Sequence, residues 1–324
     1  MELSSFVCDL TRAQAVDHTQ LLQKLWSDYG GLYRLQLRGA AMASVIAKRI
    51  DLLPPTSHPR GWQGQIGHAR KQRSYQVELN WYRHYAGLTS SLCRVPAYLG
   101  CHQGDDDLIV VMEDLQSTGF EPLEPRLTDA HLLATLRWLA EFHARFMADN
   151  GDCLWPSGCY WHLETRQQEL AAMDDGPLKQ ASAALDAALQ GCRYQTLVHG
   201  DAKTANFLVQ PDSGDIAAVD FQYVGKGVGV RDLAYLLGSA LDDATLLASG
   251  ERWLQHYLDT LSNALQQRYH WSPQAAMAVC QQWQQLYPLA WADFERFLQG
   301  WSPGHWKLGR YSARQTDLAL AQLT

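Results

Sequence analysis

Short apolar runs separated by polar turns restrict the first third of the chain to a small β-rich fold. Residues 32–37 alternate apolar and polar side chains, which is typical of a half-buried strand. Residues 44–48 and 108–112 are short runs with many β-branched side chains, and they predict two more strands. A helix leading into a turn is expected at residues 6–27, and a second helix at residues 68–88. This part of the chain therefore predicts a small sheet with one helix against it.

From about Asp129 the hydrophobic pattern becomes helical. Leu132, Leu136 and Leu139 recur at the spacing of a helix face. Only residues 196–223 interrupt this pattern, because two apolar runs there flank the turn sequence Pro211-Asp212-Ser213-Gly214-Asp215, which predicts a β-hairpin. The other helices are expected at residues 164–190, 231–248, 251–269, 273–300 and 312–322.

With 324 residues, the chain is long enough for two domains or lobes. The change of pattern predicts an α+β fold, with a small mixed β-sheet lobe at residues 1–115 and a larger, mainly helical lobe at residues 116–324. Residues 114–128 are the expected hinge. A loop is expected at residues 54–60, which contain three prolines.

Composition excludes several classes of function. Lysine and arginine number 27 against 34 acidic residues, so the net charge of −7 argues against a nucleic-acid-binding surface. No apolar run reaches the roughly 18 residues that cross a bilayer, and the N-terminus lacks the pattern of a signal peptide. The seven cysteines form no C-x-x-C pair. We therefore expect a cytoplasmic protein with reduced thiols, without a membrane or nucleic-acid partner and without an evident obligate protein partner.

The most informative stretch is His199-Gly200-Asp201, followed by Asn206 and, after the predicted hairpin, by Asp220. Asp201 follows a strand, Asn206 lies five residues further on, and the hairpin should return Asp220 to the same neighbourhood. Two carboxylates and an amide oxygen are the hard ligands that suit Mg²⁺. One carboxylate would remain to orient or deprotonate a hydroxyl group.

This pattern resembles the phosphotransfer site of protein kinases, in which a metal-binding Asn follows the loop Asp by five residues. His199-Gly200-Asp201 and Asp220-Phe221-Gln222 differ from the protein-kinase motifs in ways that resemble the aminoglycoside phosphotransferase and choline kinase superfamily. The resemblance covers roughly residues 29–240 and implies a protein-kinase-like two-lobe fold. It is closest to the ecdysteroid-kinase-like branch, on the strings at residues 111–115, 139–144, 219–222 and 231–237.

The resemblance implies that the first lobe binds ATP. Lys48, after Val45-Ile46-Ala47, matches the family lysine that holds the α- and β-phosphates, and Glu78 matches its glutamate partner. A solvated lysine at a strand end and an ordinary exposed glutamate are the alternatives. The backbone of Glu113 and Leu115 would meet the adenine. A full glycine-rich phosphate loop is missing, and only Gly30 and Gly31 stand in its place.

The implied reaction is transfer of the γ-phosphoryl group of ATP to a hydroxyl of a small-molecule acceptor. Asp201 would act as the base, and Asn206 and Asp220 would bind Mg²⁺. Lys203 either neutralises the transferring phosphoryl group or is a solvated loop lysine. Only eleven residues separate Asp220 from Asp232, and no A-P-E signature follows, which disfavours a protein substrate.

Several residues have a simpler structural role as the favoured interpretation. His199 is expected to pack and hydrogen-bond the loop, Asp232 to cap a helix or brace that loop, and His143 to be a satisfied core histidine. The C-terminal tryptophans are expected to pack, although some could line an aromatic acceptor pocket that takes a cation. Acidic groups would suit such a cation. The residues concerned are Trp253, Trp271, Trp283, Trp291, Trp301 and Trp306, with Asp242, Asp243, Asp293 and Glu295.

Two alternative functions remain open from the sequence. One is a choline, ethanolamine or aminoglycoside kinase proper, which differs only in the acceptor. The other is a nucleotide-binding pseudokinase without catalysis. Intact Asp201, Asn206 and Asp220 argue against the pseudokinase, because loss of one of them is its usual signature.

Overall fold

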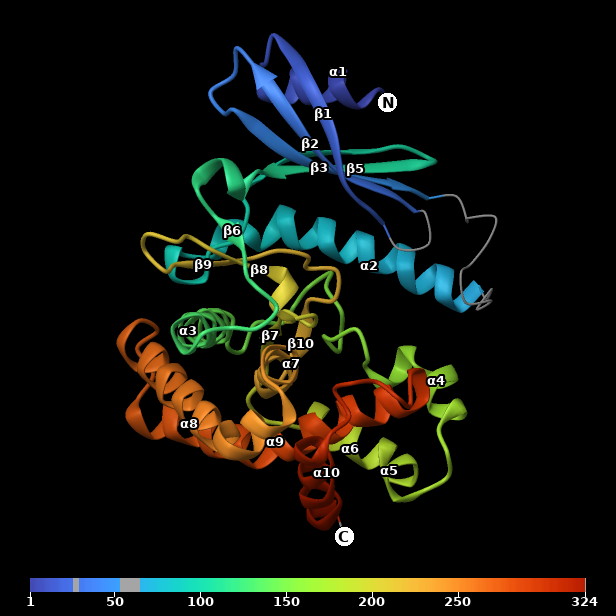
Figure 1. The fold of residues 1–324 in the computed structure, drawn as a ribbon, viewed down its shortest axis with the longest axis vertical. Coiled ribbons are helices and arrows are strands. Elements are labelled where there is room, and N and C mark those ends of the chain that lie inside the picture. The colour runs from blue at the N-terminus through green and yellow to red at the C-terminus, as the bar shows by residue number, and fades with distance from the viewer. Residues whose placement is uncertain (26–28, 53–64, 324) are drawn as a thin grey trace. The chain divides into compact units, whose positions relative to one another are not determined.

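The computed structural model describes residues 1–25, 29–52 and 65–323, so the expected loop at residues 54–60 lies outside the described residues (Figure 1). The chain divides into two compact units. The first consists of Met1–Leu88 and Val95–Glu121, and the second of Thr89–Arg94 and Pro122–Thr324. The first holds a sheet and the second is mainly helical, which confirms the predicted α+β class. Among the described residues, no helix has the length and apolar character needed to cross a membrane.

The first unit is built on a five-stranded antiparallel sheet in the order β1-β2-β3-β5-β4. The central strand, β3, pairs with β2 and β5, so both of its backbone edges are hydrogen-bonded within the sheet. The strands predicted at residues 32–37, 44–48 and 108–112 are confirmed as parts of β2, β3 and β5. The bounds are β1 Ala15–Lys24, β2 Gly30–Arg38, β3 Ser44–Asp51, β4 Tyr98–Gln103 and β5 Asp107–Glu113.

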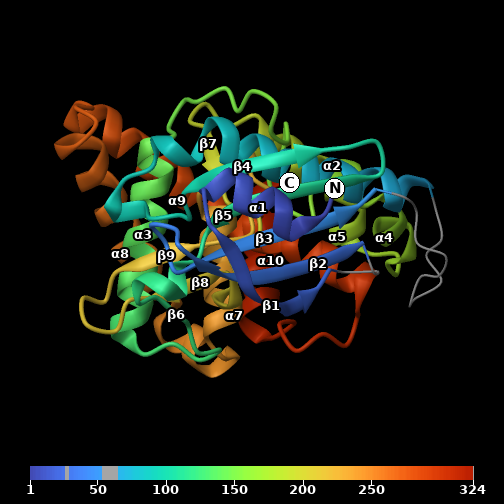
Figure 2. The same cartoon turned by 90° about the horizontal axis from the view of Figure 1, so that it is seen from above.

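Two helices cover opposite faces of this sheet (Figures 1 and 2). Helix α1 (Leu3–Thr11) buries Val7 against Ala47 and other apolar side chains of one face. Lys48, the next residue of β3, points to the other face, where its side chain meets helix α2 (Gln65–His84). Because successive side chains of a strand point to opposite faces of the sheet, Ala47 lies in an apolar core and Lys48 makes a polar contact.

The helix predicted at residues 6–27 is wrong beyond its first turns. Helix α1 ends at Arg12, whose φ of 57° is left-handed, and strand β1 follows. Most of β1 is exposed on both faces at the edge of the sheet. Such a strand carries polar side chains on both faces, which removes the period-two pattern that sequence reasoning needs.

The second unit is mainly helical, and two predicted helices have different bounds. The segment 164–190 is broken into α4, α5 and α6. The helix expected at residues 231–248 ends earlier, because Asp242 caps a new helix by accepting a hydrogen bond from the Thr245 N–H. The bounds are α3 Asp129–Arg145, α4 Gln167–Ala172, α5 Pro177–Gln180, α6 Ser182–Gln190, α7 Val230–Ala240, α8 Asp243–Gln267, α9 Pro273–Trp301 and α10 Arg310–Leu323.

Short strands of this unit frame the Asp201 region. The predicted hairpin is confirmed, since β8 (Phe207–Val209) and β9 (Ile216–Ala218) pair in antiparallel fashion. Strand β7 (Thr196–Val198), which leads to Asp201, pairs with β10 (Gly225–Gly227). The short β6 (Glu121–Pro122) completes the sheet of β8 and β9.

Candidate active site

The loop of residues 199–206, called the Asp201 loop below, begins with a conformation that needs glycine. Gly200 has a φ of 82°, and a Cβ atom there would lie 2.1 Å from the carbonyl oxygen of Tyr223. Both N–H groups at the start of the loop donate to one buried carboxylate: His199 to Asp232 at 2.6 Å, and Gly200 to Asp232 at 2.9 Å. Asp232 therefore braces the loop, which was one of its two expected roles, and its side chain does not cap α7.

Asp201 is almost fully buried, and one of its carboxylate oxygens has two donors from the same loop. Lys203 Nζ donates to Oδ2 at 2.9 Å, and Asn206 Nδ2 donates to Oδ2 at 3.1 Å. Asn206 Nδ2 also donates to the backbone carbonyl of Asp201 at 2.8 Å. These contacts hold the Asp201 carboxylate in one orientation and leave the Asn206 side-chain oxygen as the atom available to another ligand.

Two backbone contacts bring Asp220 to the same place. The Val219 N–H donates to the Asn206 carbonyl at 2.9 Å, and His199 Nε2 donates to the Val219 carbonyl at 3.0 Å. Asp220 then turns through a left-handed φ of 69°. Burial alone would lower the pKa of Lys203, but the charges of Asp201 and Asp220 outweigh burial and raise it. Both carboxylates therefore act on one ammonium group, as the hairpin predicted.

The donor set around Asn206 and Asp220 fits Mg²⁺. This ion takes one or two protein carboxylates and completes its shell with water and phosphate oxygens. Asn206 offers an amide oxygen and Asp220 a carboxylate whose Oδ1 also accepts from Gln222. In residues 1–25, 29–52 and 65–323 no group of three or more His, Cys, Asp or Glu side chains could hold a metal ion.

His199 and His143 have structural contacts. His199 Nδ1 accepts from the Asp201 N–H at 3.2 Å while Nε2 donates to Val219, so both ring nitrogens serve the backbone of the loop. His143 contacts Tyr257 Oη at 2.7 Å and Asp232 Oδ2 at 3.1 Å, and is fully buried. The expectation of a satisfied core histidine is confirmed for His143, and His199 lies as a loop-bracing residue would.

The first unit contains the predicted lysine–glutamate pair. Lys48 Nζ donates to Glu78 Oε2 at 2.6 Å, and both side chains are buried. The register of β3 places Lys48 opposite Val110 of β5 and Leu32 of β2. A buried ammonium held by a carboxylate on a helix is a fixed cation, which is what a phosphate-binding role requires.

The other predicted residues of the first unit lie at strand ends. Gly30 and Gly31 are the first residues of β2, and a Cβ on Gly30 would lie 2.2 Å from the Arg49 carbonyl. Glu113 ends β5, and its backbone N–H and side chain both pair with Ala97. Leu115 is buried. Their predicted contacts with ATP remain predictions.

Sequence reasoning missed Asp114, which lies between two of the predicted residues. Its carboxylate accepts from Arg34 Nε at 2.7 Å and from Ser44 Oγ at 2.6 Å. It also accepts from the Gln116 N–H at 3.2 Å, so it caps the turn after β5. The string at residues 111–115 includes Asp114, but it did not predict the hydrogen bonds of Asp114 with Arg34 and Ser44.

Tyr160 and Tyr235 lie near the Asp201 loop, and the sequence predicted a role for neither, although Tyr235 is part of the string at residues 231–237. Burial first, then the charges and hydrogen bonds of Asp201 and Tyr160, raise the pKa of Tyr235 well above its ordinary value. The Tyr160 and Tyr235 rings lie 5.5 Å apart, and the Tyr160 N–H donates to the Gly200 carbonyl at 3.0 Å. Tyr160 is therefore joined to the Asp201 loop through its backbone, and its ring lies beside that of Tyr235.

Lys307 is the third such neighbour. Its Nζ lies 4.1 Å from the centre of the Tyr235 ring. Burial lowers the pKa of Lys307 to about 7; the charge of Asp201 opposes this shift, and the charge of Lys203 adds to it. Lys307 follows Asp201 by more than a hundred residues and lies in an irregular segment, so no local pattern in the sequence could place it.

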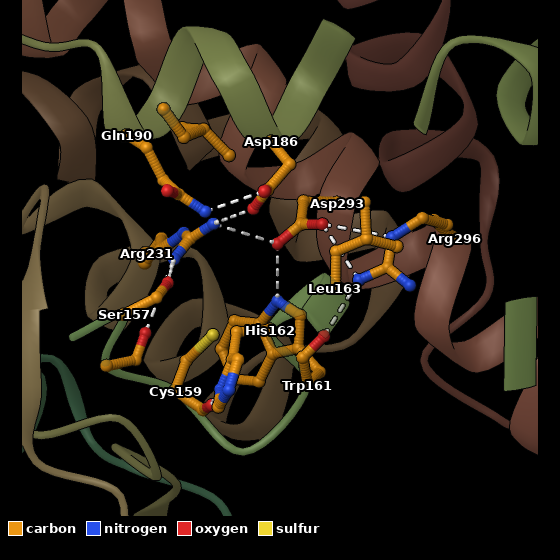
Figure 3. Close-up of polar contacts among 12 residues, drawn as sticks. Ser157, Cys159, Trp161, His162, Leu163, Asp186, Gln190, Arg231, Asp293 and Arg296 are labelled. Carbon is orange, nitrogen blue, oxygen red and sulfur yellow. Dashed lines mark hydrogen bonds and ion pairs between the residues drawn. The ribbon is translucent and has the colours of Figure 1, made fainter. Parts of the chain in front are cut away.

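A buried polar network holds the segment that carries Tyr160 (Figure 3). Arg231 donates to Ser157 Oγ at 3.0 Å and to Asp293 Oδ2 at 3.3 Å. Asp293 also accepts from Arg296 Nε at 3.0 Å and from Trp161 Nε1 at 3.1 Å (Figure 3). These contacts connect α7 and α9 to residues 157–161, so they fix the backbone on either side of Tyr160.

Comparison with known proteins gives a family match over most of the chain. The model of the phosphotransferase enzyme family (APH) matches residues 34–273. No curated protein matches the sequence.

Solved structures agree on the fold. The amicoumacin kinase hAmiN, in complex with AMP-PNP and Ca²⁺, is 14% identical with a TM-score of 0.53, covering 100% of this chain and 93% of that one. A candidate aminoglycoside phosphotransferase from Ralstonia eutropha is 11% identical with a TM-score of 0.52, covering 98% and 94%. At these identities the likeness concerns the fold alone, and it confirms the predicted α+β, protein-kinase-like class.

Proposed function

This chain belongs to the phosphotransferase enzyme family, and from that premise we propose that it transfers the γ-phosphoryl group of ATP to a hydroxyl of a small molecule. The observation that carries this proposal is the Asp201 loop. It joins Asp201, Lys203 and Asn206 by direct hydrogen bonds and adjoins Asp220. The proposed base, the cation and one metal-binding oxygen thus come from one short segment, and the adjacent hairpin brings the other proposed metal ligand, Asp220, to it.

Asp201 is proposed as the base. Its carboxylate is oriented by Lys203 and Asn206, so an acceptor hydroxyl could donate a hydrogen bond to it. During transfer the acceptor oxygen forms a bond to the γ-phosphorus, and the bond from that phosphorus to the β–γ bridging oxygen breaks. The proton of the hydroxyl passes to Asp201, and ADP is the leaving group.

Mg²⁺ is the proposed cofactor, with Asn206 and Asp220 as its protein ligands. When bound, it would neutralise charge on the phosphate oxygens. The amide nitrogen of Asn206 already donates hydrogen bonds to Asp201, so the amide oxygen is the atom left to bind the metal ion. Lys203 serves the same electrostatic purpose on the acceptor side, since it is held between two carboxylates.

Lys48 is proposed to hold the α- and β-phosphates of ATP, with Glu78 keeping it in place. Gly30 and Gly31 would allow the backbone to approach the phosphates, and the backbone of Glu113 and Leu115 would contact the adenine.

A small acceptor is supported by the short connection after Asp220. Strand β10 and helix α7 follow it directly, so a long segment for docking a peptide does not fit there. We place the protein in the cytoplasm, where ATP is available. All seven cysteines lie in the described ranges, and none forms a disulfide.

The direct test is ATP turnover with a panel of hydroxylated small molecules. Release of ADP that depends on both Mg²⁺ and an acceptor, with the phosphorylated acceptor identified by mass spectrometry, is the expected result. Tight Mg-ATP binding without turnover of any acceptor would contradict the proposal and favour the pseudokinase.

A further inference from the structure

The connection between α9 and α10, residues 302–309, contains Lys307, whose side chain lies near the loop of the proposed base. Lys307 Nζ lies 4.1 Å from the centre of the Tyr235 ring and 5.6 Å from that of Phe294. The Tyr235 ring lies 5.5 Å from that of Tyr160, whose N–H donates to the carbonyl of Gly200, the residue before Asp201. The charge of Asp201 also acts on the ammonium group of Lys307. The cation therefore belongs to the surroundings of the Asp201 carboxylate.

Lys307 differs from Lys203 in its ion pairing. Within the part of the chain that the structure describes, no carboxylate oxygen lies within 4.0 Å of its Nζ, whereas Lys203 has Asp201 at 2.9 Å. Burial lowers the pKa of Lys307, Lys203 lowers it further, and Lys307 in turn contributes to lowering the pKa of His305. A desolvated ammonium without a counter-ion is costly, and a bound anion would offset that cost.

The acidic groups that the sequence offered for a cationic acceptor are mostly engaged elsewhere. Asp242 caps α8. Asp243 accepts from the Tyr311 N–H at 2.8 Å. Asp293 is fully buried between Arg231 and Arg296. Three of the four candidates therefore have structural partners.

The fourth acidic group, Glu295, lies in a different place. It lines a pocket of about 380 Å³, and neither Asp201 nor Lys307 is among the residues that line this pocket. Its Oε1 accepts from Gln299 at 3.0 Å. Lys203 and Lys307 are thus the cations of the Asp201 neighbourhood, where Asp220 adds a second carboxylate.

We propose that Lys307 binds an acidic group of the acceptor, so that the preferred substrate is a small hydroxylated anion and not a polycationic amine. This inference rests on the proposed function and names the substrate class of the same site. Tyr160 and Tyr235 would form the wall beside the hydroxyl that receives the phosphoryl group, while Lys307 holds the anionic end. Trp306, which is 66% exposed and lies 5.4 Å from Lys307 Nζ, would lie next to the rest of the acceptor.

The test compares acceptors that share a skeleton and differ in charge: glycerate with glycerol, gluconate with glucose, and choline and kanamycin as cations. Glycerol 3-phosphate separates a phosphate ester from a carboxylate. We expect kcat/KM to be at least tenfold higher for the anionic member of each pair. Preferred turnover of neutral or cationic acceptors would overturn the inference and leave the kinase assignment intact.

Substitution of Lys307 locates the effect. Lys307→Met should raise the KM of the anionic acceptor at least tenfold and leave the KM of ATP unchanged. It should also remove the difference in kcat/KM between the anionic and the neutral acceptor of each pair. Lys307→Arg should retain most of the preference. Arg310→Met, which removes an exposed cation three residues further on, is the matched control. If Lys307→Met instead lowered kcat equally for every acceptor and for ATP hydrolysis, Lys307 would act on the transferring phosphoryl group, and the inference would be wrong.

Binding without ATP separates this inference from the proposed function. Calorimetric titration of glycerate, gluconate and glycerol 3-phosphate into the wild-type protein and Lys307→Met needs no turnover. Binding weakened at least tenfold by Lys307→Met supports the inference even if no phosphoryl transfer occurs. Equal binding to both proteins, or binding to neither, overturns it.

Discussion

The carboxylate of Asp232 accepts a hydrogen bond from the backbone N–H of His199 at 2.6 Å, two residues before Asp201. The same carboxylate also accepts from Gly200 and contacts His143. One buried side chain thus sets the position of the segment that carries the proposed base.

Replacing Asp232 with Ala should therefore impair both stability and activity. Two buried N–H groups lose their acceptor, so we expect the free energy of unfolding to fall by about 3–5 kcal/mol. In the fraction that folds, kcat should fall more than the KM of the acceptor changes. Urea unfolding and steady-state kinetics measure the two effects. Asp212→Ala, in the exposed turn of the β8–β9 hairpin, is the control and should change neither.

Asp201→Asn should abolish most turnover while nucleotide binding persists. The amide keeps the size of the side chain but cannot take the proton of the acceptor, so kcat should fall by about 10²- to 10⁴-fold. Fluorescence titration with an ATP analogue should give a Kd close to that of the wild type. Retained turnover would show that another group is the base.

Asp220→Asn should weaken the use of Mg²⁺. Exchanging a carboxylate ligand for an amide removes a negative charge from a hard-cation site, so the Mg²⁺ concentration for half-maximal rate should rise by about 10- to 100-fold. Treatment of the wild-type protein with EDTA should stop turnover, and added Mg²⁺ should restore it. A rate that does not depend on Mg²⁺ in either protein would rule out the proposed site.

Lys48→Met tests the buried pair of the first unit. It removes the cation that Glu78 holds at 2.6 Å, so we expect a loss of about 3–5 kcal/mol in stability together with a higher KM for ATP. Adding Glu78→Leu should recover much of the stability but none of the ATP affinity. Arg38→Met breaks an exposed pair with Asp17 in the same unit and should cost less than about 1 kcal/mol. If stability returned together with ATP affinity, the role assigned to Lys48 would be wrong.

His162 should make the second unit sensitive to acid. The pKa of His162 is lowered to about 4, mainly by burial and in addition by the charges of Arg231 and Arg166, whereas its contact with the Cys159 carbonyl opposes the shift. The unfolded chain therefore binds this proton at a higher pH than the folded one. Stability is retained above about pH 6.5 and falls by about 1.4 kcal/mol per pH unit as the pH decreases toward 4.

His162→Phe should flatten this part of the stability profile. Urea unfolding at several pH values between 7 and 4 measures the slope for both proteins. His256→Phe, at a half-buried position of α8, is the matched control. The same slope in wild type and His162→Phe would assign the acid sensitivity to other groups.

Local patterns were sufficient where a single side chain or a short spacing decides the structure. The strands at residues 32–37 and 108–112 have a buried face, so their apolar residues reveal them. The spacing of Asp201 and Asn206, followed by a hairpin, predicted the neighbourhood of Asp220 because a hairpin returns the chain to its start.

Sequence patterns did not predict the parts of the structure that tertiary contacts determine. Strand β1 is an exposed edge, so nothing in its polar sequence distinguishes it from a helix or a loop. Tyr235 of α7 and Lys307 of the α9–α10 connection contact each other although they are distant in sequence. The contacts of Lys307 are set by the packing of the helices on either side of its segment, and no residue spacing in the sequence predicts this packing.

Arg231 and Asp232 are neighbours in the chain, yet their side chains support different things. Asp232 holds the Asp201 loop, and Arg231 ties α7 to Asp293 and to the segment around Tyr160 (Figure 3). The α9–α10 connection takes part in neither anchor through any contact found in the described ranges. On the proposed role of Lys307, exchanges of residues in this connection would change which acceptor is phosphorylated and leave both anchors in place.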